Sequence, residues 1–126
     1  MKQILETTAA PSPIGPYSQA VKAGNMLFVS GQIAIHPPTG ALKLDSIEEE
    51  THQVMTNIGA ILKEADADYT HIVKTGIFLR DMNDFAKVNE IYGSYFTGDF
   101  PARETVQVSR LPKDVNVEIS VIAYIP

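Results

Sequence analysis

The chain has 126 residues, a length that fits one domain, and its formal net charge of −5 argues against sequence-independent binding to nucleic acid, which depends on clustered Lys and Arg. It contains no cysteine, which excludes disulfides and thiolate metal sites, and neither a bilayer-spanning apolar run nor a signal-peptide pattern. We therefore expect a cytoplasmic protein folded as a single domain over residues 1–126, with no nucleic acid and no membrane among its partners.

Residues 1–16 are expected to form a short edge strand and a stiff loop. Ile4 and Leu5 favour the strand, whereas the Pro and Gly residues between 11 and 16 continue neither a helix nor a central strand. The loop fixes the direction of Tyr17, whose ring packs on the core or whose hydroxyl donates into a pocket. The residue alone favours core packing.

Two strands over residues 18–22 and 26–35 are predicted to form a hairpin, because Gly24-Asn25 between them suits a tight turn. The second strand contains Ser30-Gly31, a small hydroxyl followed by a residue without a side chain. This pair marks a β-bulge or strand end, or else a place where a ligand approaches the backbone closely, and the residues alone favour neither interpretation.

A capping box and a helical apolar spacing predict a helix from Ser46 to about residue 65. Ser46 is followed three residues later by Glu49, and the acidic run 48–50 is expected to be a solvated first turn that the helix dipole stabilises. The core-facing stripe consists of Val54, Met55, Ile58, Ile61, Leu62 and Ala65.

Metal binding is not expected. Glu49 and His52 have the i, i+3 spacing of some di-metal bundles, but such sites need further carboxylates and a second copy of the motif, which the sequence lacks. His36 and His71 are far from this pair in the sequence and belong to no paired ligand motif.

The next two elements are a strand over residues 72–80 and a helix from about Asn83 to Thr97, with Gly98 as its C′ residue. Asn89 lies beside the apolar stripe of this helix, where its amide is either a surface group or a hydrogen-bond donor toward a site. The buried face is expected to consist of Phe85, Val88, Ile91, Tyr92, Tyr95 and Phe96.

Two final strands flank the break at residues 111–114, and simple pairing of neighbours would make residues 103–110 and 116–125 a hairpin. Arg103 opens the first strand and Glu118 lies inside the second. An arginine matches a carboxylate bidentately and a carboxylate can activate water, so the pair suits hydrolysis of a small acidic substrate. An ordinary strand salt bridge is the alternative, and the charges alone favour it.

The last strand is apolar at consecutive positions from residue 121 to residue 125, so both of its faces must be covered. Two helices cover only one face of a sheet. The other face is most simply buried by identical subunits, which predicts a homo-oligomer.

Four groups of residues form a recognisable set, in a fixed order and spacing: Ile14-Gly15-Pro16-Tyr17; Ser30-Gly31-Gln32; Asp84-Phe85-Ala86-Lys87-Val88-Asn89; and Pro101-Ala102-Arg103 with Leu111-Pro112-Lys113-Asp114 and Val117-Glu118-Ile119. Together they resemble the RidA-type enamine/imine deaminases over residues 10–125. The resemblance implies a single α+β domain, chorismate-mutase-like, with a mixed, mostly antiparallel sheet and two helices packed on one face. It further implies that the last strand inserts between earlier ones and that the sheets face inward in a homotrimer, with sites in the clefts between chains.

The resemblance also implies an activity, the hydrolysis of 2-aminoacrylate-type enamines, through their imine tautomers, to 2-oxo acids and ammonia. In the family these compounds arise from pyridoxal-phosphate dehydratases acting on serine or threonine, and no cofactor is needed because an imine is already electrophilic. Arg103 would hold the substrate carboxylate with the backbone amide of Thr105, and Glu118 would orient a water and shuttle its proton. Many relatives carry cysteine at this position. Because this chain has Thr105 instead, a thiol can play no role here. The pocket would be shaped by Tyr17, Ser30, Gly31 and Asn89.

Two other functions remain as alternatives. A non-enzymatic protein could use the Arg103 cleft to sense a small carboxylic acid, but a pure binding site gains nothing from the carboxylate of Glu118 facing an anion. Cleavage of nucleic acid, as has been claimed for relatives, is disfavoured by the acidic charge.

Overall fold

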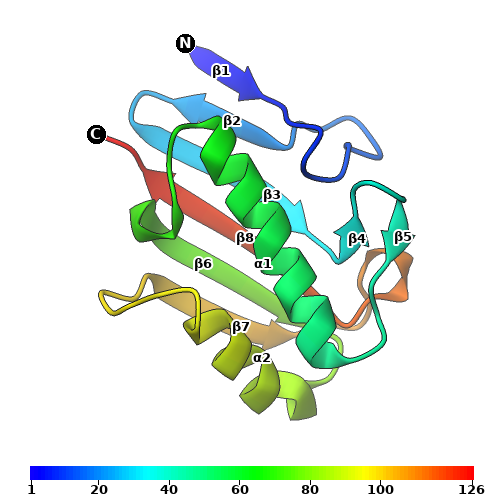
Figure 1. The fold of residues 1–126 in the computed structure, drawn as a ribbon. Coiled ribbons are helices and arrows are strands. Elements are labelled where there is room, and N and C mark those ends of the chain that lie inside the picture. The colour runs from blue at the N-terminus through cyan, green and yellow to red at the C-terminus, as the bar shows by residue number, and fades with distance from the viewer.

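A computed structural model describes all residues from 1 to 126 and shows a six-stranded sheet with both helices packed on one face (Figure 1). The strands lie in the order β1-β2-β3-β8-β6-β7, and all neighbours are antiparallel except β6 and β7. A separate two-stranded hairpin joins β4 (Ile35–His36) to β5 (Ala41–Leu42). The main elements are β1 (Lys2–Leu5), β2 (Ala20–Ala23), β3 (Met26–Gln32), α1 (Ile47–Glu64), β6 (Ile72–Leu79), α2 (Phe85–Gly93), β7 (Ala102–Gln107) and β8 (Val117–Tyr124).

Strand β8 lies in the middle of the sheet, between β3 and β6. The hairpin of the last two strands that simple neighbour pairing predicts is therefore wrong, and the inserted last strand that the motif resemblance implies is confirmed. The physical reason is composition, because the apolar β8 is buried best at the centre, while β7 carries Arg103, Glu104 and Gln107 at an edge.

Helix α1 begins after Ser46, whose side chain accepts a hydrogen bond from the Glu49 N–H at 3.0 Å. Only this half of the predicted capping box forms. Glu50 is 0% exposed, so the expectation of a fully solvated acidic turn is wrong at this residue; the turn faces the start of β8. The predicted stripe is otherwise buried as expected, with Val54, Met55, Ile58, Ile61 and Leu62 fully enclosed and Ala65 partly so.

Helix α2 is shorter than the sequence predicts. It ends at Gly93, and the N–H of Tyr95 bonds to the carbonyl of Tyr92, three residues back, which tightens the turn instead of extending the helix. Gly98 has φ of 134° in the loop beyond, so its predicted role as the C′ residue is wrong. Of the predicted buried face, Val88 and Tyr92 are buried, three residues are partly buried (Ile91, Tyr95 and Phe96), and Phe85 is exposed.

The two faces of β8 have different surroundings. Its alternate residues from Val117 to Ala123 are buried beneath the helices, whereas Glu118, Ser120, Ile122 and Tyr124 point to the opposite face, which no helix of the chain covers (Figure 1). Apolar side chains remain exposed on that open face, among them Tyr124 at 46% and Phe28 at 45%. Neither helix is long and apolar enough to cross a membrane.

Candidate active site

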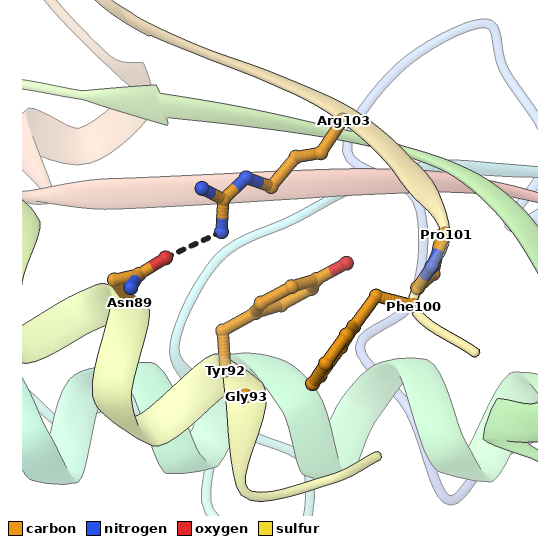
Figure 2. Close-up of a pocket in the computed structure, with 6 residues that line it drawn as sticks. All are labelled: Asn89, Tyr92, Gly93, Phe100, Pro101 and Arg103. Carbon is orange, nitrogen blue, oxygen red and sulfur yellow. Dashed lines mark hydrogen bonds between the residues drawn. The ribbon is translucent and has the colours of Figure 1, made fainter. Parts of the chain in front are cut away.

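Arg103 points from the edge strand β7 toward helix α2, as Figure 2 shows. Its Nη1 donates a hydrogen bond to Oδ1 of Asn89 at 2.6 Å, and its guanidinium lies 5.4 Å from the ring centre of Tyr92 and 5.7 Å from that of Phe85. No carboxylate of the chain forms an ion pair with it. An oriented guanidinium without an anionic partner is suited to binding a carboxylate from outside the chain.

A pocket of about 400 Å³ opens beside this guanidinium (Figure 2). The hydroxyl of Tyr92 donates to Oγ1 of Thr75 at 2.9 Å, and burial raises the pKa of this phenol. The pocket therefore offers one cation, one amide and aromatic surface. It is lined by Asn89, Tyr92, Gly93, Phe100, Pro101 and Arg103.

Glu118 lies on the open face of the sheet, against a β-bulge of β3. The register between β3 and β8 shifts between Val29 and Gln32, where Ser30-Gly31 lies. A Cβ placed on Gly31 would overlap the Glu118 carboxylate and would lie 2.8 Å from its Cδ, so only glycine leaves room for the carboxylate. Burial raises the pKa of Glu118, which favours a group that can take up and return a proton.

Tyr17 lines a small pocket of about 60 Å³ in front of Glu118, and its hydroxyl accepts a hydrogen bond from the Ile14 N–H at 3.3 Å. The ring is 50% exposed, so the residue does not pack in the core. Ser30 does not line this pocket; its Oγ donates to the Ser18 carbonyl at 2.5 Å and ties the bulge to the loop. Other residues that line the pocket include Pro11, Ile14, Gly31, Gln32 and Pro112.

Thr105 lies two residues after Arg103 on the same face of β7. Its hydroxyl is buried without a hydrogen-bond partner. Val108, three residues further on, donates its N–H to Leu79 of β6, and N–H groups of a strand alternate between its two edges. The N–H of Thr105 therefore points away from β6, toward the uncovered edge of the sheet.

The predicted site residues form two groups on opposite faces of the sheet. Arg103 pairs with Thr75 and Thr75 with Val121, so these three share the helix-covered face, whereas Glu118 is three residues before Val121 and points the other way. The first group contains Arg103, Thr105 and Asn89. The second contains Glu118, Gly31 and Tyr17.

The sequence interpretation missed three residues that touch these groups. Phe85 and Tyr92 were assigned to the buried face of the helix, yet their rings flank the Arg103 guanidinium. Their i, i+7 spacing around Asn89 was the available signal, because it places all three near one side of a helix. Gln32, buried beside Glu118, was part of a quoted motif but has no signal of its own in a single sequence.

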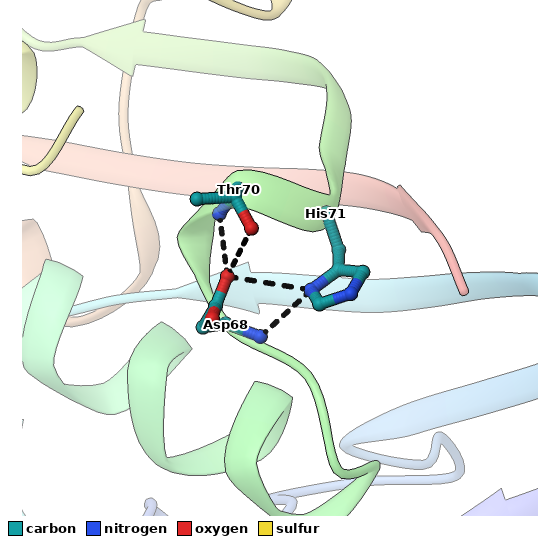
Figure 3. Close-up of polar contacts among 3 residues, drawn as sticks. All are labelled: Asp68, Thr70 and His71. Carbon is teal, nitrogen blue, oxygen red and sulfur yellow. Dashed lines mark hydrogen bonds and ion pairs between the residues drawn. The ribbon is translucent and has the colours of Figure 1, made fainter. Parts of the chain in front are cut away.

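The three histidines lie in separate surroundings, and each has a hydrogen-bond partner. His36 contacts Thr39, and His52 contacts the hydroxyl of Tyr95 at 2.7 Å. His71 accepts a hydrogen bond from the Asp68 N–H at 3.0 Å in a capping box before β6, where the Asp68 carboxylate bonds to Thr70 (Figure 3). No group of three or more potential metal ligands comes together in the chain.

Known proteins are similar to this chain over nearly its whole length. The family model described as Endoribonuclease L-PSP matches residues 7–125. A RutC family protein of Pyrococcus horikoshii is 54% identical over 124 residues, covering 98% of each chain. The 2-iminobutanoate/2-iminopropanoate deaminase of Mus musculus is 46% identical over 123 residues, covering 98% of this chain and 91% of the relative.

A solved structure confirms the fold. The crystal structure of E. coli TdcF with bound serine matches with a TM-score of 0.94 at 41% identity, covering 98% of this chain and 99% of that one. The chorismate-mutase-like α+β architecture expected from the motifs is thus shared with a relative of known structure. The chain therefore belongs to the Endoribonuclease L-PSP family, and its relatives include proteins named as 2-iminobutanoate/2-iminopropanoate deaminases.

Proposed function

We propose that this protein is a hydrolytic deaminase that converts reactive 2-imino acids, the tautomers of 2-aminoacrylate-type enamines, into 2-oxo acids and ammonia in the cytoplasm. The observation that carries the proposal is Arg103, a guanidinium oriented by Asn89 and two rings but paired with no carboxylate. Relatives support the chemistry. The mouse relative is named for 2-iminobutanoate and 2-iminopropanoate, and the E. coli relative carries serine, a small amino acid.

Arg103 would hold the substrate carboxylate through a bidentate, charge-assisted contact. The N–H of Thr105, which points to the open edge of the sheet on the same strand, would supply a further donor to this carboxylate. Fixing the carboxylate in this way places the imine carbon, which is bonded directly to the carboxylate carbon, in a defined position for attack by water.

Glu118 would act as the proton shuttle. Its carboxylate accepts a proton as water attacks the imine carbon, and the pair of electrons of the C=N π bond moves to nitrogen. The proton is then delivered to that nitrogen, which gives a carbinolamine with a hydroxyl and an NH2 group on the same carbon. Glu118 next takes the hydroxyl proton and passes it to the nitrogen. The O–H electrons form the C=O bond of the 2-oxo acid as the C–N bond breaks with its electrons on the departing ammonia. Burial supports this role, because a carboxylate with a raised pKa is a stronger base and takes a proton from water more readily than an exposed one.

We further propose that the active form is a homotrimer of single-domain subunits whose sheets face inward. Two observations support this assembly. Apolar side chains are exposed on the face of the sheet that no helix covers, and Arg103 and Glu118 lie on opposite faces of that sheet. A site that uses both residues then takes Arg103 from one subunit and Glu118 from its neighbour.

Coupled turnover tests the function. A serine or threonine dehydratase generates the enamine, and the decay of this intermediate is followed with and without the protein. We expect faster decay with the wild type, a loss of about a hundredfold or more for Arg103→Ala, because a desolvated charge-assisted contact is worth on the order of 3 kcal/mol, and little rescue by Arg103→Lys.

The same experiment separates the enzyme from the binding-only alternative. A protein that binds a 2-oxo acid through Arg103 but leaves the decay rate of the enamine unchanged would be a carboxylate sensor. Wild-type acceleration by the Arg103→Ala variant would instead remove Arg103 from the mechanism.

A further inference from the structure

Glu50 is the only charged residue among the fully buried residues of the chain, and the mechanism above does not use it. Its carboxylate has three hydrogen-bond donors and no cation. Oε2 accepts the backbone N–H groups of Asn116 at 2.7 Å and Val117 at 3.1 Å, and Oε1 accepts Nδ2 of Asn116 at 2.8 Å. Burial of a carboxylate is costly unless its oxygens accept hydrogen bonds, and these three hydrogen bonds offset that cost for Glu50.

The contact fixes the point where a turn changes into strand β8. Lys113 and Asp114 both have left-handed backbone conformations, with φ of 54° and 55°, which non-glycine residues rarely adopt. In a regular strand consecutive N–H groups point to opposite edges, yet those of Asn116 and Val117 converge on one oxygen of Glu50. Glu50 therefore holds a non-strand turn immediately before β8 and sets the residue at which the strand begins.

Glu118 is the next residue after this anchor. Its carboxylate makes no hydrogen bond and no ion pair within the chain; it packs against the bulge at Gly31 and borders the small pocket lined by Tyr17. The direction of its side chain therefore follows from the backbone. Because side chains of a strand alternate between faces, a slip of one residue at Val117 would turn Glu118 from the open face to the helix-covered face.

We infer that Glu50 is a positioning residue for Glu118: by accepting the N–H groups of Asn116 and Val117, where the turn enters β8, it holds the Glu118 carboxylate against the Gly31 bulge, where it can act on a substrate imine. The inference rests on the proposed function. The reach of the Glu50 side chain to the two N–H groups matters for this positioning, and its negative charge does not.

Two substitutions of Glu50 separate the effect of side-chain length from the effect of negative charge. Glu50→Gln keeps the length and retains one oxygen for the two backbone N–H groups, while the Asn116 amide can turn to present its own oxygen. Glu50→Asp keeps the charge but is one methylene shorter, so its oxygens are drawn back from β8. Ile61→Val, a buried substitution elsewhere on α1, controls for loss of core packing.

The experiment measures the carboxyl titration of Glu118 by carbon-13 NMR and the rate of imine decay for each variant. For Glu50→Asp we expect the Glu118 pKa to fall toward its ordinary value, with kcat at least about tenfold lower and KM within about twofold, because only the reacting carboxylate has moved. Glu50→Gln and Ile61→Val should match the wild type in both measurements.

Failure of the inference is distinguishable from failure of the proposed function. The titration needs no substrate, so a wild type without deaminase activity would refute the proposed function while the NMR comparison still decides the role of Glu50. The inference is overturned if Glu50→Asp leaves the Glu118 titration unchanged, or if Glu50→Gln alters it.

Discussion

Arg103 and Glu118 lie on opposite faces of the same sheet and on different strands, with β6 between them. Arg103 points to α2 and Glu118 points to the face that no helix covers. A small substrate that contacts both residues therefore cannot do so within one chain. The proposed reaction therefore requires the proposed assembly, because each site needs Arg103 from one subunit and Glu118 from another.

Mixed trimers test this relationship. Arg103→Ala and Glu118→Gln should each be inactive, but trimers assembled from both chains contain some sites with an intact Arg103 from one chain and an intact Glu118 from the other. After unfolding and refolding an equal mixture, we expect activity at roughly a quarter of the wild-type sites. The measurement is imine decay in the refolded mixture, with each variant refolded alone as the control.

Two outcomes would count against this prediction. If the refolded mixture contains heterotrimers by mass spectrometry but stays inactive, the two residues act within one chain or not together. Sedimentation that shows a well-folded monomer at micromolar concentration would remove the shared site altogether.

Glu118→Gln is expected to lower turnover strongly while affinity for a 2-oxo acid is retained, because the amide keeps the shape but cannot accept a proton. It should also raise thermal stability at neutral pH. Burial raises the folded-state pKa of Glu118 above its unfolded value, so the group binds more protons in the folded state, and stability is lost as pH rises through the folded pKa.

The direction of this stability change can be measured by thermal unfolding. The melting temperature of Glu118→Gln should exceed that of the wild type at pH 7. The difference should shrink as the pH falls through the raised folded-state pKa of Glu118 and should be lost below the unfolded pKa of glutamate, about 4.3. A wild type that is the more stable protein at pH 7 would show that a partner compensates the charge of Glu118.

Gly31→Ala is expected to displace the Glu118 carboxylate without unfolding the protein. A Cβ at Gly31 would overlap the end of the Glu118 side chain, which is flexible and can move away. Turnover should fall by about tenfold or more, since small misplacements of a reacting group are costly, while melting temperature changes little. In a Glu118→Gln background the same substitution should cause little further loss, and full additivity of the two effects would place Gly31 outside the action of Glu118.

Thr105 should be replaceable in its side chain but not in its backbone N–H. Thr105→Val removes a buried hydroxyl that has no partner, so we expect a gain of about 1 kcal/mol in stability and activity within about tenfold. An ester in place of the 104–105 amide deletes the N–H that points to the open edge, and should lower substrate affinity and rate. An ester variant that folds, trimerises and turns over at the wild-type rate would contradict this role.

The sequence by itself determined most of the secondary structure, because local spacing carries that information. The apolar stripe from Val54 to Leu62 defines α1, and the turn at Gly24, with φ of 61°, joins β2 to β3 as predicted. The motifs around Arg103 and Glu118 also indicate the family and the candidate site residues from the sequence alone.

Tertiary structure decided how these pieces are combined. Neighbour pairing predicted a hairpin of the last two strands, but β8 is inserted between β3 and β6, since burial of an apolar strand at the sheet centre depends on segments far apart in sequence. For the same reason Glu50 looked like part of a solvated acidic turn, although the N–H groups that bury it come from residues 116 and 117. The separation of Arg103 and Glu118 onto opposite faces likewise follows from strand register, which is fixed by long-range pairing and has no local signal in the chain.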